Sequence, residues 1–513
     1  MKRFKEYEQN QRMLLPPSLE DMIGEKEMVR VVNRVIEEMG HAELLQRFSG
    51  GGCPSFNPIM MLKVLVYAYS CAMYSSRQIA KALKRDVAFM WISGMQKPDF
   101  RTINRFRSSY FKDSLQWAFA HVVEFLKKEG YVSGEEYFVD GTTIEANANK
   151  YSYVWRKCAM RYKERSQAKV KKIFDEIDRI NREEDEKYGG KDLPEFGESA
   201  DITSEKINEV VRQINEGMKK LPNERPAKEI KKRTRKIEKL KEKIVKYEQQ
   251  IQLLDGRNSY SKTDADATFL RMKNKEIRAA YNLQVGSEKG FAVGFSVHQT
   301  GSDASTLVAH LRSRKKLGLF KPKRIVGDSA YGSEENYIEL KKRRIGNFLK
   351  YPSYLREMQG KVKPFSASMF QRLDDEDAYL CPKGKKLRFL ETKREPTRTG
   401  FMQTLKIYRC SACPHCPHVR RCCNQGSSHR HLSVNEALAV FRAQTRKNLA
   451  SEKGIELRKR RGNESEGVFA DIKFNRRFRR FSLRGKHKVT AEAALLMVAH
   501  NMRKIAALGL PPN

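Results

Sequence analysis

The stretch EEYFVDGTTIEANANK, residues 135–150, contains a short apolar run, Tyr-Phe-Val, that leads directly to Asp140. The stretch KRIVGDSAYGS, residues 323–333, repeats the pattern and brings its apolar run to Asp328. Short apolar runs of this composition predict buried strands. A carboxylate at the end of a buried strand is costly to remove from water, so its occurrence twice in one chain indicates a site.

Strand ends of one sheet lie at a common edge, where ligand sites usually form. Asp140 and Asp328 would repel each other there, and their burial would be costly unless a cation lay between them. We therefore expect the two aspartates to hold metal. Ligation by oxygen selects hard cations, Mg²⁺ or Mn²⁺. Two such ions about 4 Å apart can activate the attacking oxygen at a phosphodiester and stabilise the leaving oxygen.

The chain has 513 residues and a formal net charge of +39, from 101 Lys and Arg against 62 Asp and Glu. Such an excess repels itself in the compact state and favours an anionic partner, of which nucleic acid is the leading candidate. A membrane surface is the alternative, but the sequence has no run of about 18 apolar residues. The opening MKRFKEYEQNQRM lacks the apolar centre of a signal peptide. We therefore expect a cytoplasmic protein that binds double-stranded DNA and does not enter membranes.

Residues 1–130 have apolar residues at helical spacing, which predicts an all-helical N-terminal domain. Within it, two short helices are expected on either side of SGMQKP, the second capped by Asp99. Arg101 and Arg105 lie one turn apart on that helix and give it a basic outer face, which fits a helix-turn-helix-like DNA reader. A helical bundle with a solvated basic face is the alternative. The predicted inner face consists of Phe100, Ile103, Phe106 and Tyr110.

Residues 151–261 are rich in Lys, Glu and Arg and poor in aromatic residues, which favours a charged helical arm inserted into another domain. Isoleucines recur there every seven residues, as in a coiled-coil seam, and a second apolar stripe precedes them. The two helices are expected to pair as an antiparallel hairpin, within one chain or between two. Residues 201–221 are expected to add a third helix. The seam is Ile230, Ile237, Ile244 and Ile251, and the stripe is Val170, Ile173, Ile177 and Ile180.

The strand-rich parts are residues 131–150 and 262–375, which we interpret as the first parts of one α/β catalytic domain. Two β-rich runs flank GSEKG, whose composition is typical of a hairpin turn. A helix, the strand before Asp328, a second helix and the short strand NFLKYP follow. A cysteine-rich segment, residues 376–430, interrupts the domain. Residues 431–513 are expected to complete the domain with helices.

Three motifs together resemble the DDE transposases of bacterial insertion sequences, which are built on a ribonuclease-H-like fold. They are FVDGTTIEANANK with Asp140, IVGDSAYGS with Asp328, and RGNESEGVFADIK with Glu466. In the third motif Lys473 follows Glu466 by seven residues, which matches the family's Glu-six-residues-Lys spacing. Seven residues are two helical turns, so both side chains are expected on one face. Stretches at both ends of the chain also resemble one branch of that family.

The resemblance implies an α/β ribonuclease-H-like catalytic domain that is interrupted by a helical and a Cys-rich insertion and follows an all-α N-terminal domain. It implies that Asp140, Asp328 and Glu466 hold two Mg²⁺ (or Mn²⁺) ions, which serve to nick a transposon end and to join its 3′-hydroxyl to target DNA. Because two ends must be held together, it also implies a homodimer on DNA, in a bacterial, nucleoid-associated protein. Two alternatives stay open: a DNA-binding regulator with a degenerate acidic site, and a two-metal nuclease without strand transfer.

Other acids lie near the three motifs. Glu464 and Asp471 are expected on other faces of the helix than Glu466. Asp264 and Asp266, in SKTDADATFL, are interpreted either as acids that come near the site or as solvated loop acids. For the triad itself, the alternative interpretation is three ordinary buried or capping acids.

Arginines and phenylalanines alternate around Glu466, in LRKRRGN and in KFNRRFRRFSLRGKHK. We expect Phe474, Phe478 and Phe481 to pack inward while the arginines face phosphate. A generic solvated basic surface is the alternative. The residues predicted to contact DNA are Lys473, Arg461, Arg476 and Arg477, together with Arg101 and Arg105 of the N-terminal domain.

Six of the nine cysteines lie between residues 381 and 423, at short spacings typical of a zinc knuckle or ribbon. These six thiols, with His415 and His418 nearby, exceed the four ligands that a structural Zn²⁺ needs, so spacing leaves the ligand set open. Free thiols without a metal are the alternative. By resemblance to the family's CxxCPxxxxC pattern, the ligands would be Cys381, Cys413, Cys416 and Cys422, with Cys410 as a substitute.

Overall fold

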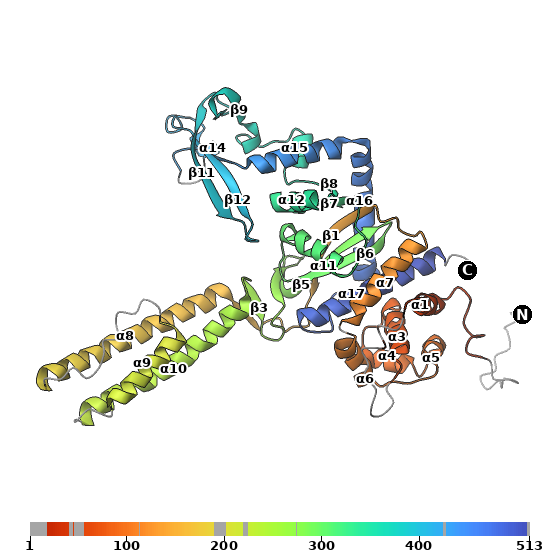
Figure 1. Cartoon of the computed structure of the whole chain (residues 1–513), viewed down its shortest axis with the longest axis horizontal. Coiled ribbons are helices and arrows are strands. Elements are labelled where there is room, and N and C mark those ends of the chain that lie inside the picture. Colours follow the sequence, from red (N-terminus) through yellow and green to blue (C-terminus); the bar gives the residue numbers. More distant parts are fainter. Residues whose placement is uncertain are drawn as a thin grey trace, which may run out of the picture. The chain divides into compact units, whose positions relative to one another are not determined.

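The computed structural model describes residues 18–40, 45, 56–111, 113–188, 202–218, 224–272, 274–423 and 427–509. These residues form a mixed α/β fold (Figure 1). The chain divides into two compact units, residues 1–144 with 282–513 and residues 145–281. The predicted N-terminal domain is part of the first unit, and its residues 1–17, 41–44 and 46–55 lie outside the described residues.

The main sheet has six strands. They are β1 (Glu136–Glu145), β4 (Thr268–Arg271), β5 (Ile277–Glu288), β6 (Phe291–His298), β7 (Arg324–Gly327) and β8 (Gly346–Leu349). Their order is β4-β5-β1-β7-β8, and β6 pairs with β5. β7 runs parallel to β1 and to β8, whereas β5 and β6 form the antiparallel hairpin predicted from GSEKG. Both strands predicted to lead to an aspartate, β1 and β7, are therefore interior strands of one sheet.

The helices of the first unit come from both ends of the chain. They include α1 (Met28–Glu37), α3 (Pro58–Ser70), α4 (Ser76–Ala82), α5 (Val87–Ile92), α6 (Phe100–Arg105), α7 (Ser114–Lys128), α11 (Leu307–Lys316), α12 (Glu334–Lys342), α15 (Glu436–Ala450), α16 (Glu452–Ala470) and α17 (Lys486–Leu508). The last of these, α17, packs against α1, α3, α7 and β6. The N-terminal helices and the C-terminal helix thus share one core. No described helix has both the length and the apolar character needed to cross a membrane.

One face of the parallel strands packs against α15 and α16. The strand register places Phe138 beside Val326 and Val326 beside Phe348. These three side chains form a buried cluster with Leu449 of α15 and Leu457 of α16. Because helices cover this face and other side chains fill the opposite face, the strands read as continuous apolar runs rather than as alternating patterns.

The opposite face of β1 carries Tyr137, which is fully buried. Its hydroxyl oxygen lies 2.5 Å from Nε2 of His310, and the guanidinium carbon of Arg314 lies 4.1 Å from its ring centre. Burial lowers the pKa of His310 well below its usual value, so the imidazole is neutral. Glycines on β5 and β6 make room for the ring: an added Cβ would lie 1.7 Å from Tyr137 Cζ at Gly286 and 2.3 Å from the hydroxyl at Gly294.

A buried carboxylate joins the C-terminal helix to the N-terminal helices. Glu492 of α17 is 0% exposed and accepts a hydrogen bond of 2.9 Å from the Tyr69 hydroxyl. It also accepts the backbone N–H groups of Ser482 and Leu483, at 2.9 and 3.0 Å. The guanidinium of Arg107 donates to the same Tyr69 hydroxyl at 2.9 Å. A buried charge requires such partners, so this polar cluster fixes how the helices meet.

The region predicted as a helix-turn-helix-like reader begins as expected. Asp99 caps α6, since its Oδ1 accepts the N–H of Thr102 at 2.7 Å. Arg101 and Arg105 are exposed. After Arg105 the chain leaves the α-helical period and forms a π-helical turn, Phe106–Tyr110. The predicted single helix is therefore a short α-helix followed by a wider turn.

The predicted inner face of this segment is only half right. Ile103 and Phe106 are buried, at 0% and 4% exposure, but Phe100 and Tyr110 are 36% and 42% exposed. The π-helical turn shifts the residues after it around the axis, which carries Tyr110 away from the core. Phe100 stands at the first helical position, and its ring centre lies 5.1 Å from the guanidinium carbon of Arg77.

The second unit, residues 145–281, contains the predicted helical arm. Its helices are α8 (Arg156–Tyr188), α9 (Ser204–Met218) and α10 (Glu224–Leu254), followed by β3 (Ser259–Ser261), which pairs with β2 (Tyr153–Trp155). Ion pairs join Lys163 to Glu248 and Glu176 to Arg233, so α8 and α10 run antiparallel within one chain. Their shared core, to which α9 contributes, is Val170, Phe174, Ile177, Ile202, Ile207, Ile214, Ile230, Ile237 and Ile244.

The cysteine-rich segment contains a second, antiparallel sheet. Its strands are β9 (Gln371–Leu373), β10 (Ala378–Leu380), β11 (Lys386–Pro396), β12 (Met402–Arg409) and β13 (His431–Val434), in the order β13-β12-β11-β10-β9. Leu387, Tyr408 and Leu432 from three of these strands pack with Cys410 and Cys413 into a buried cluster. Cys410 and Cys413 therefore lie in the core beside this sheet, and Cys381, Cys422 and Cys423 are partly buried against it.

Candidate functional site

Asp140 and Asp328 lie side by side where the pairing of β1 with β7 ends: β7 stops at Gly327, whereas β1 continues through Asp140 to Glu145. The first strand therefore does not end at Asp140, contrary to the prediction from the sequence. In the register of β1 and β7, Val139 pairs with Gly327, and the next residue of each strand is an aspartate. Arg461 of α16 reaches both: its Nη2 lies 3.3 Å from Asp140 Oδ2 and 3.6 Å from Asp328 Oδ2. The structure thus brings the two predicted aspartates to one cationic group, the kind of partner that paired carboxylates need.

Two polar contacts hold α16 in the position in which Arg461 faces the aspartates. Glu464, one turn after Arg461, is buried, and its Oε2 accepts the backbone N–H of Gly290 in the β5–β6 hairpin at 2.8 Å. At the other end, Lys453 forms a 2.6 Å ion pair with Glu136 of β1. Glu464 is therefore a structural acceptor, in agreement with its expected place on another face.

Glu466, the third predicted acid, lies five residues beyond Arg461 near the end of α16. Its side chain is exposed. Among the described residues, no three acids are already arranged as the ligands of one metal ion, so Glu466 does not complete a ready ligand set with Asp140 and Asp328. The structure therefore brings two of the three predicted acids together and leaves the third on the neighbouring helix.

Lys473 does not continue the α-helical period of Glu466. The α-helix ends at Ala470, and a π-helical turn, Asp471–Asn475, follows. Within this turn Lys473 points to β1, where its Nζ donates to the carbonyl oxygen of Thr143 at 2.7 Å. The ammonium group thus lies against β1, the strand that carries Asp140. The prediction that Lys473 and Glu466 share one face of a continuous α-helix does not hold, because the α-helix ends between them.

The environment of Asp140 disfavours its charge. Burial raises the pKa of Asp140 above its ordinary value, and the carboxylates of Asp328 and Asp303 raise it further. Arg461 and the backbone N–H of Gly141 act in the opposite direction without cancelling the increase. Asp303 is a site residue that the sequence interpretation missed, because an acid at the start of a helix ordinarily reads as a cap.

The third parallel strand also leads to a charged residue. Gly327 pairs with Leu349 of β8, and Lys350 follows. Burial lowers the pKa of Lys350, and the nearby guanidinium of Arg461 adds to this effect, while Asp328 opposes it. The sequence carried the signal, since NFLKYP has the same apolar run followed by a charge as the two aspartate stretches.

Arg476, predicted to contact DNA, is instead 3% exposed. Its Nη2 lies 2.9 Å from Asp471 Oδ2, and Nδ1 of His500 lies 2.8 Å from the same oxygen. Burial alone would raise the pKa of Asp471, but the hydrogen bond with His500 and the charge of Arg476 outweigh it and lower the pKa. The arginine therefore neutralises a buried acid, whereas the next residue, Arg477, is exposed.

The phenylalanines of this segment divide in the same way. Phe478 and Phe481 are buried, as expected, and the ring of Phe478 lies 4.9 Å from that of Tyr74. Phe474, also predicted to pack inward, is 72% exposed. It lies inside the π-helical turn, where α-helical spacing no longer predicts which side chains face the core.

Asp264 and Asp266 belong to the second unit. Asp264 is 3% exposed, and the hydroxyl of Tyr281 lies 2.9 Å from each of its carboxylate oxygens. The backbone N–H of Asp266 donates to Asp264 Oδ1 at 3.3 Å. Asp264 is thus a buried acceptor that orders its own loop, which neither interpretation of these acids predicted.

The cysteines of residues 381–423 surround a cavity of about 20 Å³, space for one atom the size of a water molecule. Backbone N–H groups of Lys385 and Arg430 donate to the sulfur atoms of Cys381 and Cys413, at 3.3 and 3.4 Å. Among the described residues, no three Cys, His, Asp or Glu side chains are already arranged as the ligands of one metal ion. The thiols around the cavity are Cys381, Cys410, Cys413, Cys416, Cys422 and Cys423.

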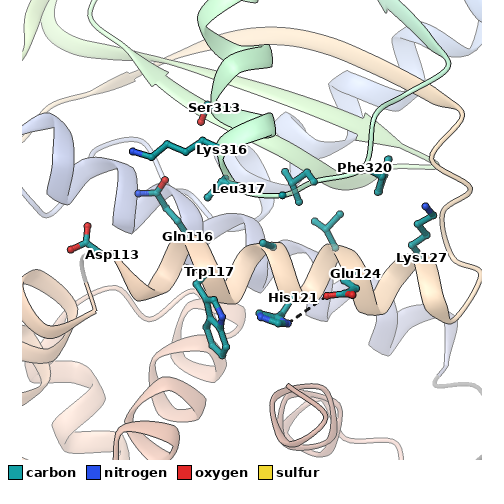
Figure 2. Close-up of a pocket in the computed structure, with 14 residues that line it drawn as sticks. Asp113, Gln116, Trp117, His121, Glu124, Lys127, Ser313, Lys316, Leu317 and Phe320 are labelled. Atoms are coloured by element: carbon teal, nitrogen blue, oxygen red, sulfur yellow. Dashed lines mark ion pairs between the residues drawn. The ribbon is translucent and has the colours of Figure 1, made fainter. Parts of the chain in front are cut away.

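A cavity of about 660 Å³ lies elsewhere in the first unit, between α7 and the end of α11 (Figure 2). Gln116 lines it from α7, and Lys316 and Leu317 line it from the opposite side. Neither Asp140 nor Asp328 borders it. Its polar groups carry both signs of charge and do not converge on one point, so the chemistry of the chain is expected at the strand ends instead.

Two families of known proteins match the chain. Residues 380–506 match the family described as Transposase DDE domain, and residues 17–109 match the family described as Transposase domain (DUF772). No curated protein matches the chain. The first match contains α16, whose Arg461 meets the paired aspartates, and the second contains the helices α1, α3, α4, α5 and α6. Both descriptions name a transposase, in agreement with the resemblance of the three motifs to the DDE transposases of insertion sequences.

Proposed function

We propose that this transposase cuts DNA at the ends of its mobile element and joins the new 3′ ends to target DNA, using divalent cations held by its acids. The observation that carries the proposal is the meeting of Asp140 and Asp328 on one guanidinium, directly after the last paired residues of two adjacent parallel strands. Carboxylates that share one point of positive charge have the donor chemistry for Mg²⁺ or Mn²⁺.

The strand order supports a ribonuclease-H-like catalytic domain. The central strand β1 has the antiparallel β5–β6 hairpin on one side and the parallel strands β7 and β8 on the other. Helix α11 lies between β6 and β7 in the chain, and α16 and α17 follow. This is the order of strand, hairpin, helix and strand that the sequence predicts.

The residues present fit a divalent cation. Arg461 stands in for it as the positive charge between Asp140 and Asp328. The pKa of Asp140 is raised chiefly by its burial, with a smaller contribution from the neighbouring carboxylates, and a bound cation would offset both effects. Glu466, exposed on the same helix as Arg461, would be the third ligand. When bound, such cations supply activation of the attacking oxygen and stabilisation of the leaving oxygen.

Several cations around the strand ends would hold the DNA. Lys473 lies against β1, and Lys350 follows β8 at the register of the aspartates. Arg477 is exposed near Lys473, and Arg101 and Arg105 are exposed in the N-terminal part. Phosphate contacts of this kind position the duplex, while the acids act on one phosphodiester. Two such chains, one on each end of the element, would form the active homodimer.

The direct test uses the purified protein with linear DNA that carries the terminal sequences of its element. We expect Mg²⁺ or Mn²⁺ to support nicking at the element ends, and a pre-nicked end with a free 3′-hydroxyl to be joined to a second DNA. Ca²⁺ or a chelator should abolish both steps but leave DNA binding. DNA binding without any nicking would favour the regulator, and nicking without joining would favour the nuclease.

We further propose that the cysteine-rich segment binds one structural Zn²⁺. Six thiols around a cavity for one atom, with backbone N–H groups directed at two sulfurs, have the composition of a thiolate zinc site. Burial and neighbouring thiols raise the pKa of Cys410 and Cys423 to about 11, so both remain protonated without a metal. Cys381, Cys413, Cys416 and Cys422 are the ligands implied by resemblance.

Cys413→Ser is expected to remove zinc from the protein and to make residues 376–430 sensitive to protease, because a structural zinc stabilises its fold directly. Metal analysis of the purified wild type should give about one zinc per chain. Cys158→Ser, in α8, is the matched control and should keep the metal. A wild type with less than about half an equivalent of zinc would end this proposal.

A further inference from the structure

A third aspartate is tied to the paired acids by buried side chains. Asp303 begins the short 3₁₀ turn Asp303–Ser305, which follows β6. Its Oδ1 accepts two hydrogen bonds of 2.7 Å, one from Nδ2 of Asn282 and one from Nε2 of Gln284. Both amides lie on β5 and are 3% and 0% exposed. Two buried donors on one oxygen fix the position of the carboxylate.

This carboxylate lies directly against the residue that follows Asp140. A Cβ added to Gly141 would lie 2.5 Å from Asp303 Oδ1 and 2.3 Å from Gln284 Nε2. Only the absence of a side chain at Gly141 therefore allows Asp303 and Gln284 to approach β1 so closely. The glycine in the motif VDG has a steric role that follows from this contact.

The same amide reaches the turn that carries Asp328. Gln284 Oε1 accepts a hydrogen bond from the hydroxyl of Tyr331. Tyr331 ends the 3₁₀ turn that Asp328 caps, and it is fully buried. Asp303 is thus one hydrogen-bonded side chain away from the turn of Asp328 and in contact with the backbone beside Asp140.

The charges at this edge do not balance without a cation. Arg461 is the partner of Asp140 and Asp328. Over the described residues, no Lys, Arg or His forms an ion pair with Asp303. Asp303 therefore adds a negative charge that has no ion-pair partner of its own among the described residues, and a divalent cation at this edge would offset it.

We infer that Asp303 is a positioning acid of the cation site: its charge strengthens cation binding by Asp140 and Asp328, and its accepted hydrogen bonds set the distance between their strands. This inference rests on the proposed function. It assigns a role to an acid outside the three motifs. Asp303 acts through Gly141 and Gln284.

Two substitutions separate the charge from the hydrogen bonds. In Asp303→Asn the amide oxygen can still accept both N–H groups, so the network is kept and only the charge is lost. In Asp303→Ala both are lost. Asp303→Ser is a second variant without charge and smaller than aspartate, in case the asparagine variant does not fold. Asp175→Asn, an exposed acid of α8, is the matched control.

The experiment measures Mn²⁺ binding to the full-length protein by calorimetry, without DNA, with thermal unfolding as the check of folding. We expect the control to bind as the wild type, Asp303→Asn to bind about tenfold more weakly, and Asp303→Ala to bind more weakly still. Asp140→Asn should abolish binding.

Wild-type affinity in folded Asp303→Asn would overturn the inference, even if Asp303→Ala binds poorly, because the hydrogen bonds alone would then account for the effect. A different result would overturn the proposed function itself. That result is a wild type that does not bind Mn²⁺, or an Asp140→Asn variant that binds it normally.

Discussion

Asp140→Asn is expected to lower the rate of DNA strand cleavage by about a thousandfold or more, because cation binding contributes several kcal/mol of transition-state stabilisation. The asparagine has nearly the same shape but cannot supply the negative charge that faces Arg461 and the cation. DNA binding should change little, since the basic residues that would contact phosphate are unaltered. The measurement is cleavage of end-labelled DNA in Mg²⁺, beside a filter-binding assay with the same DNA.

The same substitution should not destabilise the protein without metal. The pKa of Asp140 is raised in the folded state, so ionising this group costs more there than in the unfolded chain. Its penalty is absent at a pH below its unfolded pKa, about 3.9, and grows as the pH rises through that value and the folded pKa. Asp140→Asn removes the penalty, so its melting temperature in chelator should equal or exceed that of the wild type at pH 7.

The control for both measurements is Asp175→Asn, which should cleave DNA and melt as the wild type does. Cleavage by Asp140→Asn within a few-fold of the wild-type rate would remove the acid from the reaction. A large fall in its melting temperature would instead mean that the ion pair with Arg461 outweighs the burial of Asp140, contrary to the direction of its pKa.

Gly286→Ala is expected to destabilise the first unit by about 3 kcal/mol or more, the upper part of the range for overpacked cores. The new Cβ would lie 1.7 Å from Cζ of Tyr137, so the ring or the strand must move. The ring has no free space, since it is 0% exposed, contacts Nε2 of His310 and is covered by Arg314. Urea denaturation monitored by circular dichroism measures the loss.

A matched substitution should have the opposite sign. Gly467, in α16, has no atom within 4 Å of an added Cβ. Gly467→Ala should therefore stabilise the protein by up to about 1 kcal/mol through helix propensity and the unfolded state. Tyr137→Ala combined with Gly286→Ala should recover part of the loss. Equal stability of Gly286→Ala and the wild type would show that Tyr137 can move aside at no cost.

The parts of the fold that the sequence predicted have strong local patterns. The apolar runs before Asp140 and Asp328 are interior strands, because only a strand covered on both faces is continuously apolar. The heptad of the arm is buried for a similar reason, since a seven-residue repeat keeps one face toward a partner helix. In both cases the pattern of apolar residues within one short stretch was enough to predict the element.

Several incorrect side-chain predictions fall at two π-helical turns, Phe106–Tyr110 and Asp471–Asn475. Tyr110 was assigned to the inner face by α-helical spacing, and Phe474 and Arg476 were assigned by the alternation of phenylalanine with arginine. A wider turn changes which of these side chains face the core. Nothing in the local sequence marks such a turn. Each lies where its segment meets α17, so the contacts of the folded chain set it.

The site itself was predictable only in part. The two aspartates could be predicted because each directly follows a short apolar run. The position of Arg461 between them could not, because it depends on how α16 packs on the sheet. That packing is fixed by contacts of Glu464 and Glu136 with residues distant in sequence. Asp303 could not be predicted either, because its role also depends on contacts between residues distant in sequence. Its partners lie on β5, and no spacing along the chain relates them to it.

Because the guanidinium of Arg461 already serves as counterion to both aspartates, a newly synthesised chain can complete this sheet before it meets any divalent ion. The order of events differs from that of small zinc domains, where folding waits for the metal. Folded protein without a divalent cation would then become able to cut DNA once it binds the cation. Purification in chelator should accordingly leave the main sheet folded, although it would remove the zinc proposed for residues 376–430.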